Sequence, residues 1–132
     1  MISLLEGKIE LKTDKLTIIN VGGVGYRVFC SGAVLAQLKK GKEAKLFIYL
    51  CSRENILDLY GFLSFDDLEF FETLVSVSGI GPKAALSIMA LAPAETLKQA
   101  IASGQKSLLT KVSGIGQRTA ERIILELKDK IK

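Results

Sequence analysis

The sequence has no histidine and no tryptophan, and it has only two cysteines and two prolines among its 132 residues. Without histidine the chain cannot form a Ser-His-Asp or Cys-His nucleophile pair, a histidine-ligated zinc site or an imidazole acid–base shuttle. The glycine patterns of nucleotide-binding loops, G-x-x-x-x-G-K-[ST] and G-x-G-x-x-G, are also missing. These absences argue against an ATPase or a nicotinamide enzyme. We expect a binding protein that needs no cofactor and no metal.

Long apolar runs are missing as well. The longest, residues 84–94, contains Ser87 and Pro93 and is far shorter than the ~20 residues needed to cross a bilayer. The chain opens on a strand-like pattern rather than a signal peptide. Cys30 and Cys51 lie in apolar surroundings and are expected to be reduced core residues. We therefore expect a cytoplasmic protein with no membrane partner.

The first sixty residues alternate polar and apolar side chains over short stretches, which is the pattern of half-buried strands. Five short strands with one short helix predict a small closed barrel such as an OB-fold, although a sandwich alternates in the same way. The expected strands are residues 8–12, 16–19, 26–30, 44–50 and 56–60, and the expected helix is residues 33–38.

After Gly61 the apolar residues recur at helical spacing. Ser64, with Asp67 three residues later, predicts a helix N-terminus, and the last helix is expected over residues 117–131. The fold class is therefore α+β, an N-terminal OB-fold barrel followed by an all-α domain. The expected domains are residues 1–62 and 63–132.

A repeat is the most informative feature of the helical half. The segment VSGIGPKAA, residues 77–85, recurs 35 residues later as VSGIGQRTA, residues 112–120. We interpret each copy as a helix-hairpin-helix in which the first glycine adopts positive φ, the isoleucine fills the gap between two helices, and the second glycine leaves the amides of the next helix uncovered. In chain order these residues are Gly79, Ile80 and Gly81 in the first copy, and Gly114, Ile115 and Gly116 in the second.

An uncovered helix N-terminus favours an anion, and phosphate is the usual one. Lys83 and Arg118 follow the second glycine of each copy at the same offset, where their charge opposes the helix dipole unless an external phosphate binds. Residues 76–132 hold nine basic and four acidic side chains, so positive charge gathers around the repeats. A single Gly-x-Gly is as often an ordinary turn, but the duplication favours phosphate binding. Nothing in the repeats looks suited to reading bases, so we expect binding independent of sequence.

The whole chain resembles the RuvA family of Holliday-junction-binding proteins. The resemblance runs in register from the barrel to the last helix. The matching segments are residues 20–28 (NVGGVGYRV), 59–62 (LYGF), 79–83 (GIGPK), 114–122 (GIGQRTAER) and 126–130 (ELKDK).

This resemblance implies a non-catalytic DNA-binding subunit that acts in recombination, DNA repair and the SOS response. It implies a homotetramer, with an octamer left open, whose barrels lie at the centre of an open four-way junction. It also implies two protein partners, the ATP-hydrolysing motor RuvB and the resolvase RuvC. Carried over by position, the residues implied to contact phosphates are Gly79, Ile80, Gly81, Lys83, Gly114, Gly116, Gln117, Arg118 and Arg122.

The family also has an acidic pin on the turn between the last two barrel strands, where like charge repels the DNA backbone at the crossover. Here that turn carries Glu54 and Asn55, so the usual second carboxylate is missing unless Asp58 contributes. The family further has a third domain on a linker, which engages the motor, whereas this chain stops at Lys132. We therefore expect a fragment.

Two other functions are open at this stage. A general duplex- or single-strand-binding module would need exposed aromatics on which bases stack, and the candidates are Phe29, Phe47 and Tyr49. A nuclease or glycosylase would need a metal-binding carboxylate cluster or a base pocket. The acidic group in residues 66–72 is interpreted instead as a solvated helix start.

Overall fold

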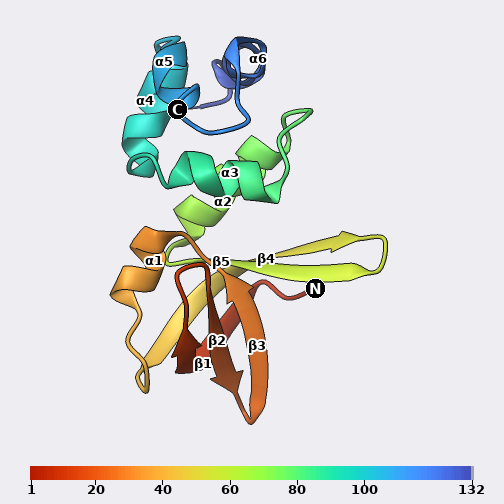
Figure 1. Ribbon diagram of the computed structural model, residues 1–132, viewed down its shortest axis with the longest axis vertical. Helices are drawn as coiled ribbons and strands as arrows, with labels where there is room; N and C mark the ends of the chain where they lie inside the picture. Colours follow the sequence, from red (N-terminus) through yellow and green to blue (C-terminus); the bar gives the residue numbers. More distant parts are fainter. Residues whose placement is uncertain (132) are drawn as a thin grey trace. The chain divides into compact units, whose positions relative to one another are not determined.

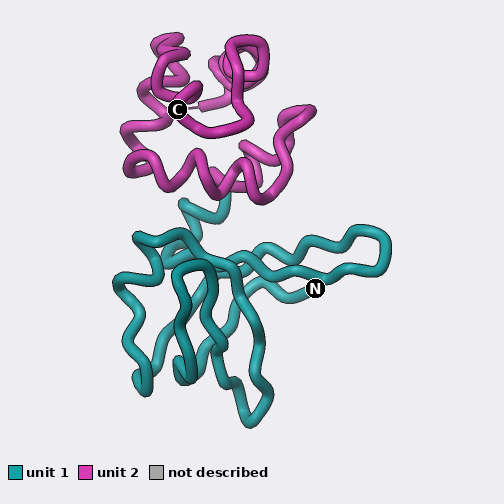
Figure 2. Tube along the Cα trace, in the orientation of Figure 1, with its two compact units in different colours: residues 1–69 teal, residues 70–132 magenta. Residues whose placement is uncertain are grey.

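The computed structural model describes residues 1–131. The chain forms two compact units, Met1–Glu69 and Phe70–Lys132 (Figure 2). The division lies inside helix α2 (Phe65–Val75), seven residues after the boundary that the sequence suggested.

Unit 1 is a closed five-stranded barrel with the strand order β1-β2-β3-β5-β4 (Figure 1). Neighbouring strands are antiparallel except β3 and β5, which pair in parallel through Val28–Leu59 and Phe29–Tyr60. Closure removes the exposed edges that a sandwich would have, so the predicted OB-like barrel is confirmed. The strands are β1 (Leu4–Lys12), β2 (Leu16–Val21), β3 (Val24–Phe29), β4 (Glu43–Arg53) and β5 (Ile56–Phe62).

The barrel core follows from the alternation in the sequence. On β4, Leu46 and Ile48 are buried on the inner face, whereas Lys45 lies on the outer face and is exposed. Successive side chains of a strand point to opposite faces, which gives this alternation. Helix α1 (Gly32–Gln37) is capped at its start by the Ser31 hydroxyl, which accepts a hydrogen bond from the Val34 N–H. The buried side chains of this core are Leu5, Ile9, Ile19, Val28, Cys30, Val34, Leu35, Leu38, Leu46, Ile48 and Leu59.

Lysine 12 fixes the other end of α1. Its Nζ donates hydrogen bonds to the Leu35 and Leu38 carbonyls, at 2.9 and 2.6 Å. A cation at a helix C-terminus satisfies free carbonyls and complements the dipole. The last residue of β1 therefore joins the strand to the only helix between β3 and β4 within the described residues.

The regular secondary structure of unit 2 is all helical over its described residues. Its apolar side chains form a core that includes Leu74, Ile88, Leu97, Leu109 and Ile123, each fully buried. The helices after α2 are α3 (Pro82–Met89), α4 (Ala94–Ala102), α5 (Lys106–Leu109) and α6 (Gln117–Leu127).

One helix limit differs from the sequence expectation. Helix α6 ends at Leu127 rather than at Ile131, because the exposed residues 128–130 form a turn that offers nothing to bury. Helix α4 begins directly after Pro93, which is its N-cap. The expected N-terminus at Ser64 is confirmed, since its hydroxyl accepts a hydrogen bond from the Asp67 N–H at 3.1 Å.

Candidate nucleic-acid interface

The two repeats form the same turn. We call residues 77–85 the first hairpin and residues 112–120 the second hairpin. Gly79 and Gly114 have φ of 89° and 91°, a left-handed backbone that a side chain would strain. One residue later, the Ile80 and Ile115 N–H groups each donate to the carbonyl three residues earlier at 3.0 Å. The predicted need for glycine at these two positions is confirmed.

The isoleucine of each hairpin anchors its turn in the unit 2 core. Ile80 is 4% exposed and Ile115 is 5% exposed, although each stands between two exposed glycines. Burying one such side chain contributes about 1.5–3 kcal/mol relative to leaving it in water. The buried isoleucine thus fixes the turn against the core of unit 2, and the backbone of the turn stays at the surface. Ile80 was predicted among the residues that contact phosphate, but its side chain packs in the core.

The second glycine of each hairpin is the N-cap of the helix that follows. Gly81 and Gly116 have extended backbone, with φ of −90°, and neither helix has a side-chain cap. The first N–H groups bonded to these caps are those of Ala85 and Ala120, at 3.0 Å. A Cβ built on either glycine meets no atom within 4 Å. The N–H groups of residues 83–84 and 117–119 come before these amides and have no hydrogen bond within residues 1–131. Free N–H groups at a helix N-terminus, with open space beside the cap, are the arrangement that binds an anion.

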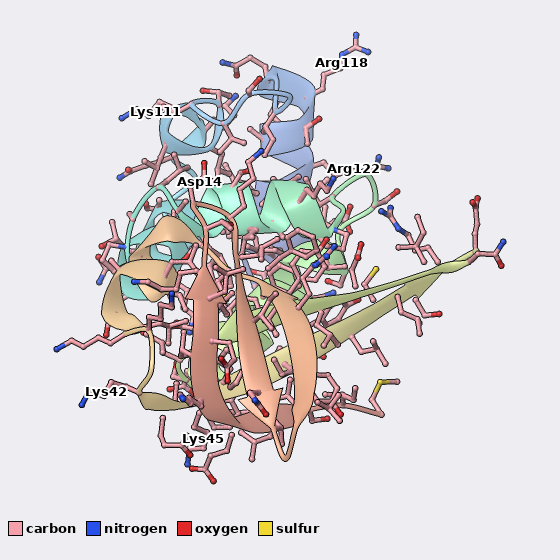
Figure 3. All side chains as sticks on the ribbon, turned by 60° about the horizontal axis from the view of Figure 1, so that its bottom comes forward. Asp14, Lys42, Lys45, Lys111, Arg118 and Arg122 are labelled. Carbon is pink, nitrogen blue, oxygen red and sulfur yellow. The ribbon has the colours of Figure 1, made fainter. Side chains whose placement is uncertain are left out.

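Cations stand beside both open helix ends. Lys83 and Arg118 are the second residues of α3 and α6, and both are exposed. Arg122 follows one turn after Arg118 on the same face of α6, where its Nε contacts the Glu126 carboxylate at 3.2 Å. Figure 3 shows Arg118 and Arg122 extending from α6 into solvent, while Lys111 points away from both.

An ion pair braces the second hairpin. Lys106 of α5 donates from its Nζ to a Glu121 carboxylate oxygen of α6 at 3.0 Å, so it joins the two helices that flank the turn. Both side chains are about half exposed, and such pairs contribute between 0 and about 1 kcal/mol. The pair also neutralises Glu121, which is the acidic side chain nearest in sequence to Arg122.

The predicted pin turn is the two-residue connection between β4 and β5, where Arg53 and Ile56 form the last strand pair. Glu54 and Asn55 are both exposed, and Glu54 has φ of 50°, the only positive φ of a non-glycine residue within 1–131. Asp58 does not complete this turn. It pairs with Cys51 further along the strands, where its charge, after burial, raises the pKa of Tyr60.

The aromatic residues that a single-strand binder would need are engaged with other rings. The Phe29 and Tyr49 ring centroids lie 5.6 and 6.5 Å from that of Tyr60, and Phe47 lies 6.1 Å from Phe65. These distances are those of ordinary aromatic pairs, and all three side chains are half-buried. The barrel therefore does not present them as free stacking platforms.

The sequence interpretation missed Thr119, the third residue of α6. Its side chain is half-buried beside the open helix end, and no hydrogen bond from its hydroxyl is present within residues 1–131. Aligning the two repeats could have found it, because Thr119 has a hydroxyl where the equivalent residue of the first hairpin, Ala84, has only a methyl group.

Neither a metal cluster nor a membrane-spanning helix is found among residues 1–131. Among residues 1–131, no group of three Cys, Asp or Glu side chains is placed to hold a metal ion. No helix there is both long and apolar enough to span a bilayer. The acidic residues Asp66 and Asp67 lie in the first turn of α2, as the solvated helix start predicted.

Comparison with known proteins assigns each half of the chain to a family model. Residues 1–61 match the RuvA N terminal domain, and residues 71–129 match the SAM-like helix-hairpin-helix tandem. Similar curated proteins are 43% identical in Acetivibrio thermocellus, 45% in Mycobacterium sp. (strain KMS) and 46% in Dehalococcoides mccartyi. The matches cover 99–100% of this chain and 66–68% of those proteins. Each of the three is named Holliday junction branch migration complex subunit RuvA.

Proposed function

The chain belongs to the RuvA family, and from this premise we propose that it binds four-way DNA junctions and holds them open for branch migration. The observation that carries the proposal is the duplicated open helix end, with Gly81 and Gly116 as caps and a cation at the next position but one. The chain spans about two thirds of the length of the relatives it matches.

The hairpins bind the sugar-phosphate backbone of the junction arms. Each offers backbone N–H groups at a helix N-terminus, and the adjacent cation neutralises phosphate charge. Lys83 and Arg118 supply that charge, and Arg122 adds to it. Gly79, Ile80 and Gly114 shape the turns, and Gln117 extends the open end of α6. Because backbone contacts carry no base information, binding is independent of sequence.

The pin turn contributes repulsion at the crossover. In a tetramer each subunit presents the Glu54 carboxylate, while Asn55 supplies no charge. Like charges between the pin and the DNA backbone disfavour closure of the crossover, so that strands stay separated as they exchange. With one carboxylate per subunit, this repulsion is weaker than with two.

The assembly and partners of the whole protein follow from the family. We propose a tetramer with the barrels at its centre, and a cytoplasmic, non-catalytic role in which the motor RuvB hydrolyses ATP. The resolvase RuvC is the other proposed partner. A general duplex- or single-strand-binding module is the competing function, and the paired rings of Phe29, Phe47 and Tyr49 count against stacking of single strands.

A competition experiment tests junction binding. Labelled four-way junction is bound at fixed moderate salt and challenged with excess unlabelled junction, duplex or single strand. We expect only junction to compete well. If duplex competes equally, the hairpins bind DNA but the protein does not select junctions, and the proposed function is wrong. Sedimentation of the free and bound protein tests the tetramer in the same samples.

A further inference from the structure

The two hairpins have the same turn, but they do not offer a phosphate the same backbone donors. Position 82 is proline and position 117, its equivalent 35 residues later, is glutamine. Proline has no N–H. In the first hairpin, the N–H groups of Lys83 and Ala84 are the ones that precede the first bonded amide. In the second, the N–H groups of residues 117–119 all precede it, so the second hairpin offers three donors where the first offers two.

The side chains differ in the same direction. Thr119 places a hydroxyl without a hydrogen bond, among residues 1–131, at the third position of α6, where the first hairpin has the methyl group of Ala84. Arg122 places a guanidinium one turn further on, where the first hairpin has Ser87.

The cations at the second helical position also differ. Arg118 presents a planar fork of N–H donors that matches phosphate oxygens, whereas Lys83 presents a point charge. The Glu126 carboxylate holds Arg122 through Nε, which leaves the terminal nitrogens of that guanidinium for another partner. The donors and cations at positions 117, 118, 119 and 122 therefore favour the second hairpin over their equivalents, and the two carboxylates that it gains, Glu121 and Glu126, are each paired with a cation, Lys106 and Arg122.

We propose that the second hairpin is the dominant phosphate grip of each subunit and that the Thr119 hydroxyl is a further phosphate ligand within it. The first hairpin holds the DNA backbone loosely. This inference rests on the proposed function, because it divides the binding of one junction arm between the two turns. Each arm is then anchored at one point and guided at another, so that a duplex can move through the subunit without complete release.

Matched variants at equivalent positions test the division. Lys83→Gln and Arg118→Gln each remove one exposed cation from the same position of a hairpin. We expect Arg118→Gln to lower junction affinity by about tenfold and Lys83→Gln by about threefold. In salt titrations, Ser87→Arg should steepen the dependence of log K on log salt by about 0.9, the value for one added phosphate contact.

The hydroxyl is tested by Thr119→Val, which keeps the branched shape and removes the donor. We expect about a fivefold loss of junction affinity with an unchanged salt slope. Thr96→Val is the control, since Thr96 lies on α4 outside both hairpins and should bind as the parent does. Thermal unfolding of all variants establishes that each is folded.

The outcomes separate this inference from the proposed function. If the parent protein shows no preference for junctions, the proposed function is wrong. If the parent binds junctions and Lys83→Gln costs as much as Arg118→Gln, the unequal division is wrong. If Thr119→Val binds as Thr96→Val does, Thr119 is not a ligand.

Discussion

Gly79 and Gly114 lie 35 residues apart and adopt the same left-handed backbone, with φ of 89° and 91°. Around them the same hydrogen bond closes each turn, and the same isoleucine is buried. The match shows that the sequence repeat is a structural repeat. Two equivalent turns on one unit provide the pair of backbone-binding sites that the proposed function needs.

Replacing either of these glycines should destabilise unit 2. Gly79→Ala and Gly114→Ala each place a Cβ at positive φ, which costs about 1–2 kcal/mol. Denaturant unfolding with an unchanged m-value measures the loss. Gly116→Ala is the matched control, because its φ of −90° suits any residue, and it should unfold close to the parent. Equal losses at Gly114 and Gly116 would contradict the argument from backbone strain.

Filling the open space at a helix cap should reduce binding rather than stability. Gly116→Val adds a side chain where nothing lies within 4 Å, in an extended backbone that β-branched residues favour. We expect thermal unfolding close to that of the parent and a loss of junction affinity of at least about tenfold, because the phosphate no longer approaches the amides. Binding that survives this variant would show that the second hairpin does not use its backbone.

Charge at the pin turn should change junction affinity in a salt-dependent way. Glu54→Gln should raise the affinity by about twofold and Asn55→Asp should lower it by a similar factor, since each changes one charge that faces DNA. Both effects should shrink as salt rises. Asp14→Asn removes an exposed carboxylate from the β1–β2 turn as the control (Figure 3). A control effect as large as that of Glu54→Gln would point to net charge instead of position.

The buried thiol of Cys30 should resist alkylation. Burial raises its pKa from 9.0 to about 12, so at pH 8 the folded protein holds a protonated, inaccessible thiol.

The same pKa shift makes the free energy of unfolding depend on pH. Above pH 9 the Cys30 thiol of the unfolded chain loses its proton and that of the folded chain keeps it, so stability falls as the pH rises from 9 towards 12. Unfolding at several pH values should show a weaker decline in Cys30→Ala than in the parent. Identical slopes would mean that Cys30 does not carry this dependence.

Much of the fold can be predicted from local sequence patterns. Alternation along β4, from Ala44 to Leu50, is enough to predict which side chains enter the barrel, because period 2 leaves one choice of face. The glycines of the hairpins are predictable for a related reason, since few residues tolerate their φ. Closure of the barrel is different. It depends on the parallel pairing of β3 with β5, which joins distant segments and leaves no local signal.

The site was predictable in position and less so in detail. The repeat placed Lys83 and Arg118 beside open helix ends, but it did not show that Arg122 is bound by Glu126 or that the Thr119 hydroxyl is free within the described residues. Those facts depend on rotamers and on which atoms meet in three dimensions. The end of α6 escaped prediction as well, because Ile131 continues the apolar spacing after the helix has stopped.

Ethylation interference on a four-way junction tests the central claim most directly. Each phosphate of the junction is ethylated at random, and the bound and free fractions are compared at fixed salt. The account predicts interference at short clusters of arm phosphates, repeated on all four arms whatever their sequence, and fewer positions with Gly116→Val. Interference confined to the crossover, or to base positions in one sequence, would contradict binding of the arms by the hairpins.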